Sequence, residues 1–291
     1  MLGASVSSGR AGEVQRFIRR GARGLRELAL LVVLWIGYTL VRATAGTDVA
    51  AARGSALGIL RIERALHVDV EQSLDRWVTG VRGVEVVASF WYASLHLLVT
   101  GSVLLWLYLR HPDAYRPLRR ALVVATGIAL VCYLALPTAP PRLLPGYTDI
   151  LERTADVGWW PAAGGASSVP TNELAAFPSM HAGWSLWVGL ALVVAARRRV
   201  VRWLGACYAL GTAAVVVLTA NHWVLDVVVG WVVVAVPAVW LLCGTARPVD
   251  PTPDPPVAAR EHGEVAVRED DAVREHDGVG PAGFEPATSA V

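Results

Sequence analysis

The sequence predicts an all-α fold, a polytopic membrane bundle of about six transmembrane helices. Hydrophobic residues make up 54% of the 291 residues, charged residues only 17%, and the mean hydropathy is +0.46. A soluble domain of this length carries more charge and fewer apolar residues. The apolar residues also gather into runs of about 20, the length that a helix needs to cross a bilayer core of about 30 Å.

Six apolar runs are candidate spans: 25–43, 84–109, 120–137, 180–196, 200–220 and 223–243. The third is short and ends at Pro137, and the fourth opens with polar residues. The connection 44–83 carries an apolar stripe at helical spacing, made of Ile59, Ile62, Leu66, Leu74 and Trp77. This stripe predicts an interfacial helical segment between spans one and two, lying on the outer surface.

The distribution of arginine predicts the orientation of the spans. The chain has no lysine, so all 26 basic side chains are arginines, and they concentrate in residues 1–24 and in the connections 110–120 and 197–202. Short arginine-rich loops stay in the cytoplasm, so we expect both termini there, in a bacterial-type plasma membrane. The expected parts are a basic cytoplasmic segment (1–24), the six-helix membrane domain (25–245) and a disordered cytoplasmic tail (246–291).

Three short polar segments fall on the extracytoplasmic side of this topology. They are Pro-Thr-Ala-Pro-Pro-Arg at 137–142, Pro-Ser-Met-His at 178–181 and Asn-His-Trp-Val-Leu-Asp at 221–226. They come from distant parts of the chain, after span three, before span four and at the entry to span six. The sequence therefore predicts that they converge on one membrane face.

His222 and Asp226 are four residues apart, so in a helix their side chains lie on one face and within reach. A carboxylate so placed accepts a hydrogen bond from one ring nitrogen and leaves the other as a nucleophile or base. The alternative is a pair that only satisfies itself at a helix entry. An aspartate at the start of an apolar span is costly and commonly functional, which favours the catalytic interpretation.

His181 follows a predicted helix start, where unpaired N–H groups and the helix dipole favour an anion. Ser179 is expected either to cap that helix or to contact the same anion. Arg142, in a stiff proline-rich segment, is the candidate phosphate clamp; its alternative is an arginine that snorkels to the interface. His96, inside span two, is interpreted as a satisfied intramembrane histidine rather than a substrate contact.

The motif at 178–181 and His222-x-x-x-Asp226 resemble the second and third motifs of the type 2 phosphatidic acid phosphatase superfamily. The variant Pro-Ser-Met-His at 178–181, together with the segments 137–142 and 221–226, more narrowly resembles the bacterial relatives of inositol phosphorylceramide synthase. The similarity covers roughly residues 28–243. It implies a reaction without metal or other cofactor, in which His222 attacks phosphorus and becomes a phosphohistidine. Asp226 would orient His222, and His181 would protonate the leaving oxygen.

Two features depart from the superfamily pattern. Its first motif contains a lysine, which this chain lacks, so Arg142 is the expected substitute. Arg110 followed by Arg116-Pro117 imitates that motif, but it falls on the cytoplasmic side and is interpreted as a decoy. The arginine expected upstream of the nucleophilic histidine is also missing, because Val-Val-Val-Leu-Thr-Ala precedes Asn221.

The predicted function is that of a membrane lipid phosphatase or phosphotransferase with an extracytoplasmic active site. Its expected partners are a lipid phosphate and the bilayer, and no nucleic acid. An alcohol acceptor such as inositol, in place of water, would make it a headgroup transferase. Two more distant alternatives are a metal-dependent membrane hydrolase, with two histidines and an aspartate as ligands, and a non-catalytic transporter or scaffold.

Overall fold

The computed structural model describes residues 24–37, 39–40, 48–160 and 173–245. Within these ranges the regular structure is helical, and the single β-type pairing, between Thr138 and Ala175, belongs to no strand. The all-α prediction is therefore confirmed. The described residues belong to one unit, Met1–Ala246, whereas the second unit, Arg247–Val291, lies outside them. The predicted tail at 246–291 and nearly all of the predicted N-terminal segment also lie outside the described residues.

Among the described residues, four helices are long and apolar enough to cross a membrane. The first, Arg82–Arg110, joins α4 (Arg82–Phe90), the π-helical turn η1 (Trp91–Leu95) and α5 (His96–Arg110). The others are α6 (Pro112–Ala135), α9 (Arg199–Leu218) and α10 (Val224–Thr245). The span predicted at 120–137 is longer than expected, because proline is favoured in a first helical turn and Pro112 starts α6 there.

Helix α8 (Met180–Ala195) is apolar but has only 16 residues, about 24 Å of helix. It packs against α5, α6, α9 and α10. Its Trp187 is fully buried and donates from Nε1 to the carbonyl oxygen of Leu118 in α6 at 2.8 Å. The span predicted at 180–196 is thus a short helix among the longer ones. The span predicted at 25–43 is described only at 24–37 and 39–40, which are helical.

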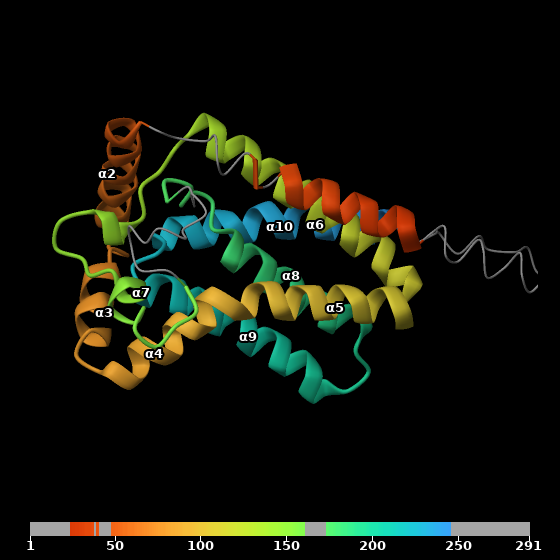
Figure 1. The fold of residues 1–291 in the computed structure, drawn as a ribbon. Coiled ribbons are helices and arrows are strands. Elements are labelled where there is room, and N and C mark those ends of the chain that lie inside the picture. The colour runs from red at the N-terminus through yellow and green to blue at the C-terminus, as the bar shows by residue number, and fades with distance from the viewer. Residues whose placement is uncertain (1–23, 38, 41–47, 161–172, 246–291) are drawn as a thin grey trace, which may run out of the picture. The chain divides into compact units, whose positions relative to one another are not determined.

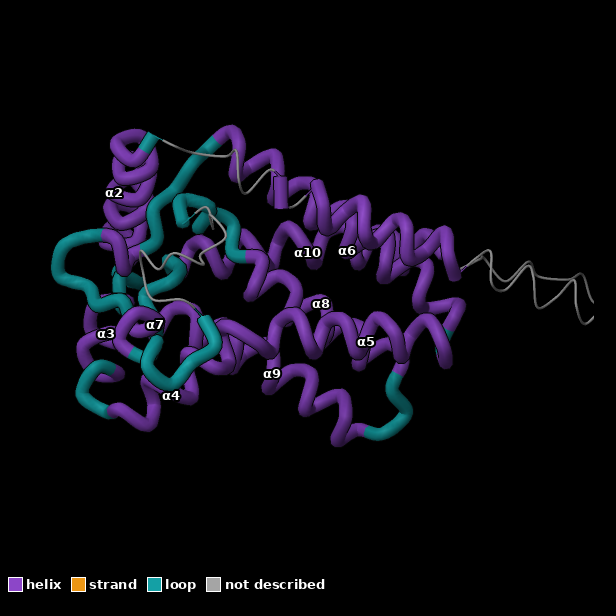
Figure 2. Tube along the Cα trace, viewed as in Figure 1, coloured by secondary structure: helices purple, strands orange, loops and turns teal. Residues whose placement is uncertain are grey.

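The connection before the first long helix forms α2 (Val49–Leu66) and α3 (Glu71–Val78), as the apolar stripe predicts. Asp48 caps α2 by accepting from the N–H of Ala51 at 3.0 Å. The stripe itself is only partly buried, because Ile62, Leu66 and Trp77 are more than half exposed. Helices α2 and α3 lie at one end of the long helices, next to the short α7 (Ile150–Arg153), where the longer loops also gather (Figures 1 and 2).

The starts of α8 and α10 approach each other closely at Gly230. A Cβ atom at this position would lie 2.2 Å from the carbonyl oxygen of Ser179, so only glycine permits the approach. Nearby, the backbone N–H of Ser179 donates to the carbonyl oxygen of Asp226 at 2.9 Å. The segment that leads into His181 is therefore joined directly to the first turn of α10.

Candidate active site

The three predicted polar segments meet at one cavity, where α8 and α10 begin and α6 ends. Its walls include Pro140 and Arg142 from the first segment, His181 from the second, and Asn221 and His222 from the third. The cavity measures about 50 Å³, which is more space than one bound water needs. The structure therefore brings both histidines and the predicted arginine together in the wall of one cavity.

His181 is the second residue of α8. Ser179 adopts the capping alternative, since its Oγ accepts from the N–H of Ala182 at 3.3 Å and its side chain is fully buried. Ser179 is not among the residues that line the cavity. The imidazole of His181 stacks on Tyr92, with ring centroids 4.3 Å apart, and lies 5.7 Å from the ring of His222. His181 thus lies at a helix N-terminus, where backbone N–H groups favour an anion.

His222 is 5% exposed, and its Nδ1 has two oxygen neighbours. The carbonyl oxygen of Ala176 is closer, at 2.9 Å, and Oδ2 of Asp226 lies at 3.4 Å. The expected aspartate is thus beside the ring, but the shorter contact is to the backbone carbonyl. A donor Nδ1–H leaves the lone pair of the neutral imidazole on Nε2, the nitrogen suited to nucleophilic attack.

Asp226 is fully buried in the first turn of α10. Its Oδ2 accepts from the backbone N–H of Trp223 at 2.9 Å, and its Oδ1 has no hydrogen-bond partner among the described residues. The side chain therefore does two things: it caps the helix that follows His222, and it places an oxygen 3.4 Å from the imidazole.

Arg142 lies in the 3₁₀ turn η2 (Pro141–Leu143) with its guanidinium largely buried. Its Nε donates to Oδ1 of Asn221 at 2.9 Å, and its Nη1 donates to Oδ2 of Asp149 at 2.7 Å. Burial opposes the charge, but the carboxylates of Asp149 and Glu173, with Tyr92, outweigh burial and raise the pKa of Arg142. The cavity therefore keeps a fixed positive charge beside His222, although part of it is already neutralised by Asp149.

His96 makes the local contact expected of a satisfied histidine, with Nδ1 3.0 Å from the carbonyl oxygen of Tyr92. It also does more than the sequence indicated, because its ring centroid lies 4.0 Å from that of His181. Tyr92 lies within the π-helical turn η1 and His96 directly follows it, and such turns recur at functional sites. The turn directs the side chains of Tyr92 and His96 toward His181. The sequence pattern did not predict this π-helical turn.

Further residues of the cavity wall were not singled out from the sequence. Tyr133, at the end of α6, donates to the carbonyl oxygen of Pro178 at 3.0 Å and so braces the segment before His181. Glu173 lies 3.9 Å from Nη1 of Arg142 and is 45% exposed. Asn221 belongs to the polar segment 221–226 and directly precedes His222. Only this position in the sequence indicated that Asn221 lies near the site.

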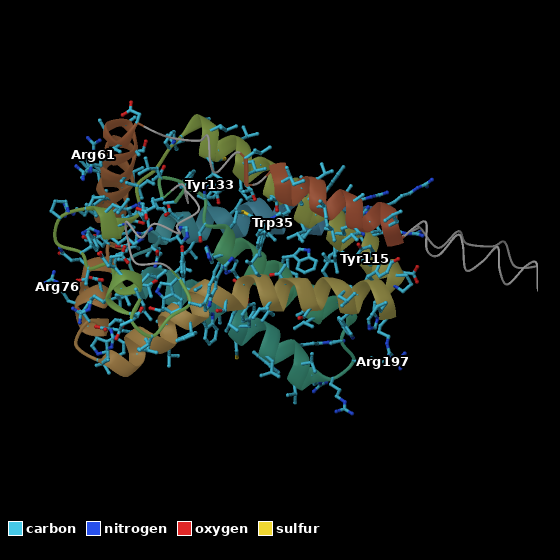
Figure 3. All side chains as sticks on the ribbon, in the orientation of Figure 1. Trp35, Arg61, Arg76, Tyr115, Tyr133 and Arg197 are labelled. Carbon is cyan, nitrogen blue, oxygen red and sulfur yellow. The ribbon has the colours of Figure 1, made fainter. Side chains whose placement is uncertain are left out.

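The Arg116-Pro117 pair, which imitates the first motif of the superfamily, lies far from the cavity. Arg116 is exposed near the start of α6, and 17 residues of helix, about 26 Å, separate it from Tyr133 near the other end. Figure 3 agrees, because Tyr115 and Arg197 lie toward one end of the bundle, and Arg61 and Arg76 of α2 and α3 lie toward the other. Arg116 therefore does not contribute to the cavity.

No group of three or more His, Cys, Asp or Glu side chains is placed to hold a metal ion in the part of the chain that the structure describes.

Residues 57–240, more than half of the chain, match the family model of the PAP2 superfamily. This range contains all five residues that the sequence nominated for the site. Comparison with curated proteins and with solved structures finds no match.

Proposed function

Because the chain belongs to the PAP2 superfamily, a family of membrane phosphatase-type enzymes, we propose that it acts on a lipid phosphate through a phosphohistidine formed on His222. The observation that carries the proposal is the pair of imidazoles around one cavity, with the His181 and His222 centroids 5.7 Å apart and Arg142 in the same wall. A nucleophile, a proton donor and a cation are the groups that phosphoryl transfer needs.

In the first step, the Nε2 lone pair of His222 forms a bond to phosphorus, and the bond from phosphorus to the lipid oxygen breaks. His181, as an imidazolium, gives its proton to that oxygen, so the lipid of a phosphate monoester leaves as an alcohol. In the second step, water attacks the phosphohistidine and His181 takes a proton from it. Inorganic phosphate and free His222 result, with Asp226 balancing the positive charge that develops on the ring.

The transferase alternative differs only in the second step, where an alcohol such as inositol replaces water. One observation favours it: the Glu173 carboxylate on the cavity wall is 45% exposed and lies beside Arg142. A carboxylate accepts hydrogen bonds from hydroxyl groups but repels a phosphate. An acceptor hydroxyl is therefore a suitable neighbour for Glu173.

We further propose that the cavity faces the extracytoplasmic side. The support is that the arginines of 110–120 and 197–202 lie at the end of α5, in the first turns of α6, after α8 and in the first turn of α9, and these ends of α5 and α8 lie away from His96 and His181. Short loops of this kind remain in the cytoplasm. Right-side-out vesicles should therefore turn over lipid phosphate in their outer leaflet, whereas turnover only in inverted vesicles would contradict this orientation.

The test is a panel of ³²P-labelled lipid phosphates, including isoprenoid phosphate, phosphatidic acid and phosphatidylglycerol phosphate, with and without inositol. We expect release or transfer of label, together with acid-labile phosphate on the protein. His222→Ala should lack both, whereas the matched control His111→Ala, at the other end of α5, should keep both. Full activity in His222→Ala would overturn the mechanism. So would activity lost to a chelator and restored by zinc, or lipid flux without turnover.

A further inference from the structure

Three consecutive backbone N–H groups follow His222, and each donates to a buried carboxylate. The three contacts are Trp223 N–H to Asp226 Oδ2 at 2.9 Å, Val224 N–H to Glu71 Oε1 at 2.9 Å, and Leu225 N–H to Glu63 Oε1 at 2.8 Å. Asp226 belongs to α10 itself, but Glu71 opens α3 and Glu63 lies in the last turn of α2. Two helices outside the long bundle therefore hold the first turn of the helix that His222 precedes.

Glu63 and Glu71 are unusual for residues on short helices outside the spans, because both side chains are fully buried. A buried carboxylate is costly unless it is paired or hydrogen-bonded. Glu85, which is equally buried, pairs with Arg82 and Arg153 at 3.4 and 3.1 Å. Among the described residues, no arginine pairs with Glu63 or Glu71, and the two acidic side chains interact with each other. Their contacts with backbone N–H groups are directed at α10.

We propose that Glu63 and Glu71 are positioning residues for His222, which hold the first turn of α10 and thereby the ring that attacks phosphorus. The inference rests on the proposed function, because it assigns α2 and α3 a part in that same reaction. The physical reason is that the first N–H groups of a helix lack partners within it, so external acceptors determine how its first turn lies. A displacement of about 1 Å at a reacting group lowers the rate by about 100-fold.

The pairing of two acids also makes the arrangement sensitive to pH. Burial, with the nearby Glu71 and Asp226 carboxylates, raises the pKa of Glu63 to about 8 despite the hydrogen bond from Leu225. The groups that face Glu63 are Glu71 on α3, Asp226 on α10 and Tyr147 in the loop after η2, with the exposed Arg64–Asp69 pair alongside. Above pH 8, a further negative charge therefore develops beside Glu71 and Asp226.

The sign of the effect on stability follows from the raised pKa. The folded protein holds the Glu63 proton between the ordinary value of 4.5 and about 8, whereas the unfolded chain releases it. Stability from this group is therefore greatest below pH 4.5 and declines as the pH rises to about 8. For activity, we expect turnover to fall as the pH rises through 8, since the added charge disturbs the carboxylates that hold α10.

The experiment compares alanine and glutamine substitutions at both positions in the full-length protein. Alanine removes the acceptor oxygen, so Glu63→Ala and Glu71→Ala should slow phosphohistidine formation from a labelled lipid phosphate by about 100-fold, with little change in KM. Glutamine keeps an acceptor oxygen and should restore most of the rate. With p-nitrophenyl phosphate, whose leaving group needs no proton from His181, Glu63→Gln should also lose the decline above pH 8. The matched control is Glu85→Ala, a buried carboxylate that pairs with Arg82 and Arg153, which should form phosphohistidine at the wild-type rate.

The outcomes separate this inference from the proposed function. A wild-type protein that never forms phosphohistidine would refute both. If the wild type forms phosphohistidine and Glu63→Ala and Glu71→Ala form it at the wild-type rate, the positioning role alone is overturned. Thermal unfolding in detergent identifies alanine variants that fail to fold. In that case Glu63→Gln decides, because an unchanged decline above pH 8 in a folded Glu63→Gln protein would contradict the inference.

Discussion

The imidazole rings of His181 and His222 face one cavity, with centroids 5.7 Å apart and ring planes inclined by 54°. One ring comes from the first turn of α8 and the other from the turn before α10. In the proposed mechanism, this cavity holds the phosphate, with His222 as the nucleophile and His181 as the proton donor.

If His181 protonates the leaving oxygen, its loss matters most for leaving groups that need a proton. His181→Ala should lower turnover of an alkyl lipid phosphate by about 10²- to 10⁴-fold. Turnover of p-nitrophenyl phosphate, whose leaving group departs without a proton, should fall much less. Steady-state kinetics on both substrates provide the measurement. Equal losses on the two substrates would contradict the role of His181 as the acid.

Arg142 is expected to hold the phosphate, with Asp149 and Asn221 fixing its guanidinium. Hydrogen bonds to charged groups contribute about 1.5–3 kcal/mol, so Arg142→Ala should lower kcat/KM by about 10- to 100-fold. Arg142→Lys should recover only part of the loss, because an ammonium cannot reproduce the planar fork. Arg116→Ala is the matched control at the other end of α6. A similar loss in Arg116→Ala would favour the rejected motif as the phosphate site.

His96 contacts the ring of His181 and is expected to support it by packing. His96→Phe keeps a ring at this position and should retain most of the turnover. His96→Ala removes the ring and should lower turnover by about tenfold, which corresponds to about 1.4 kcal/mol in the barrier. Equal losses in the two variants would instead assign the function to the ring nitrogens, and His96 would then take part in proton transfer.

Gly230 sets the distance between α8 and α10. In Gly230→Ala the new methyl group would meet the backbone carbonyl of Ser179, which cannot move aside as a side chain can. Overpacking of this kind costs about 1–3 kcal/mol, so we expect a lower unfolding temperature in detergent together with lower activity. Gly127→Ala in α6 is the control, because no atom lies within 4 Å of its added Cβ. Identical stability of the two variants would contradict the close approach.

The sequence was sufficient for the helical character of the membrane domain and for the location of most long helices. A membrane span must satisfy its backbone hydrogen bonds within the helix, so apolar runs near 20 residues are direct signals. The proximity of His222 and Asp226 was also predicted, but the helix premise was wrong, because His222 lies in the turn before α10 and not within the helix. The start of α6 at Pro112 was missed, because the first turns of that helix are polar and lie outside the apolar run.

Other features of the site depend on contacts between distant segments. Ala176, which lies 46 residues before His222, supplies the nearest oxygen to its Nδ1. His96 reaches His181 only through the π-helical turn, and Ser179 proved to be a helix cap rather than a residue of the cavity wall. None of these relationships has a local sequence signal.

The sequence by itself thus determined the class of fold and the two histidines, the aspartate and the arginine to consider. Hydropathy and helical periodicity are local patterns within one segment, so they can be recognised from the sequence alone. Tertiary structure alone decided which atoms meet, because that depends on how separate helices pack. Glu63 and Glu71 are the clearest case: along the chain they are ordinary charged residues of surface helices, and only the docking of α2 and α3 on α10 buries them beside the turn that carries His222.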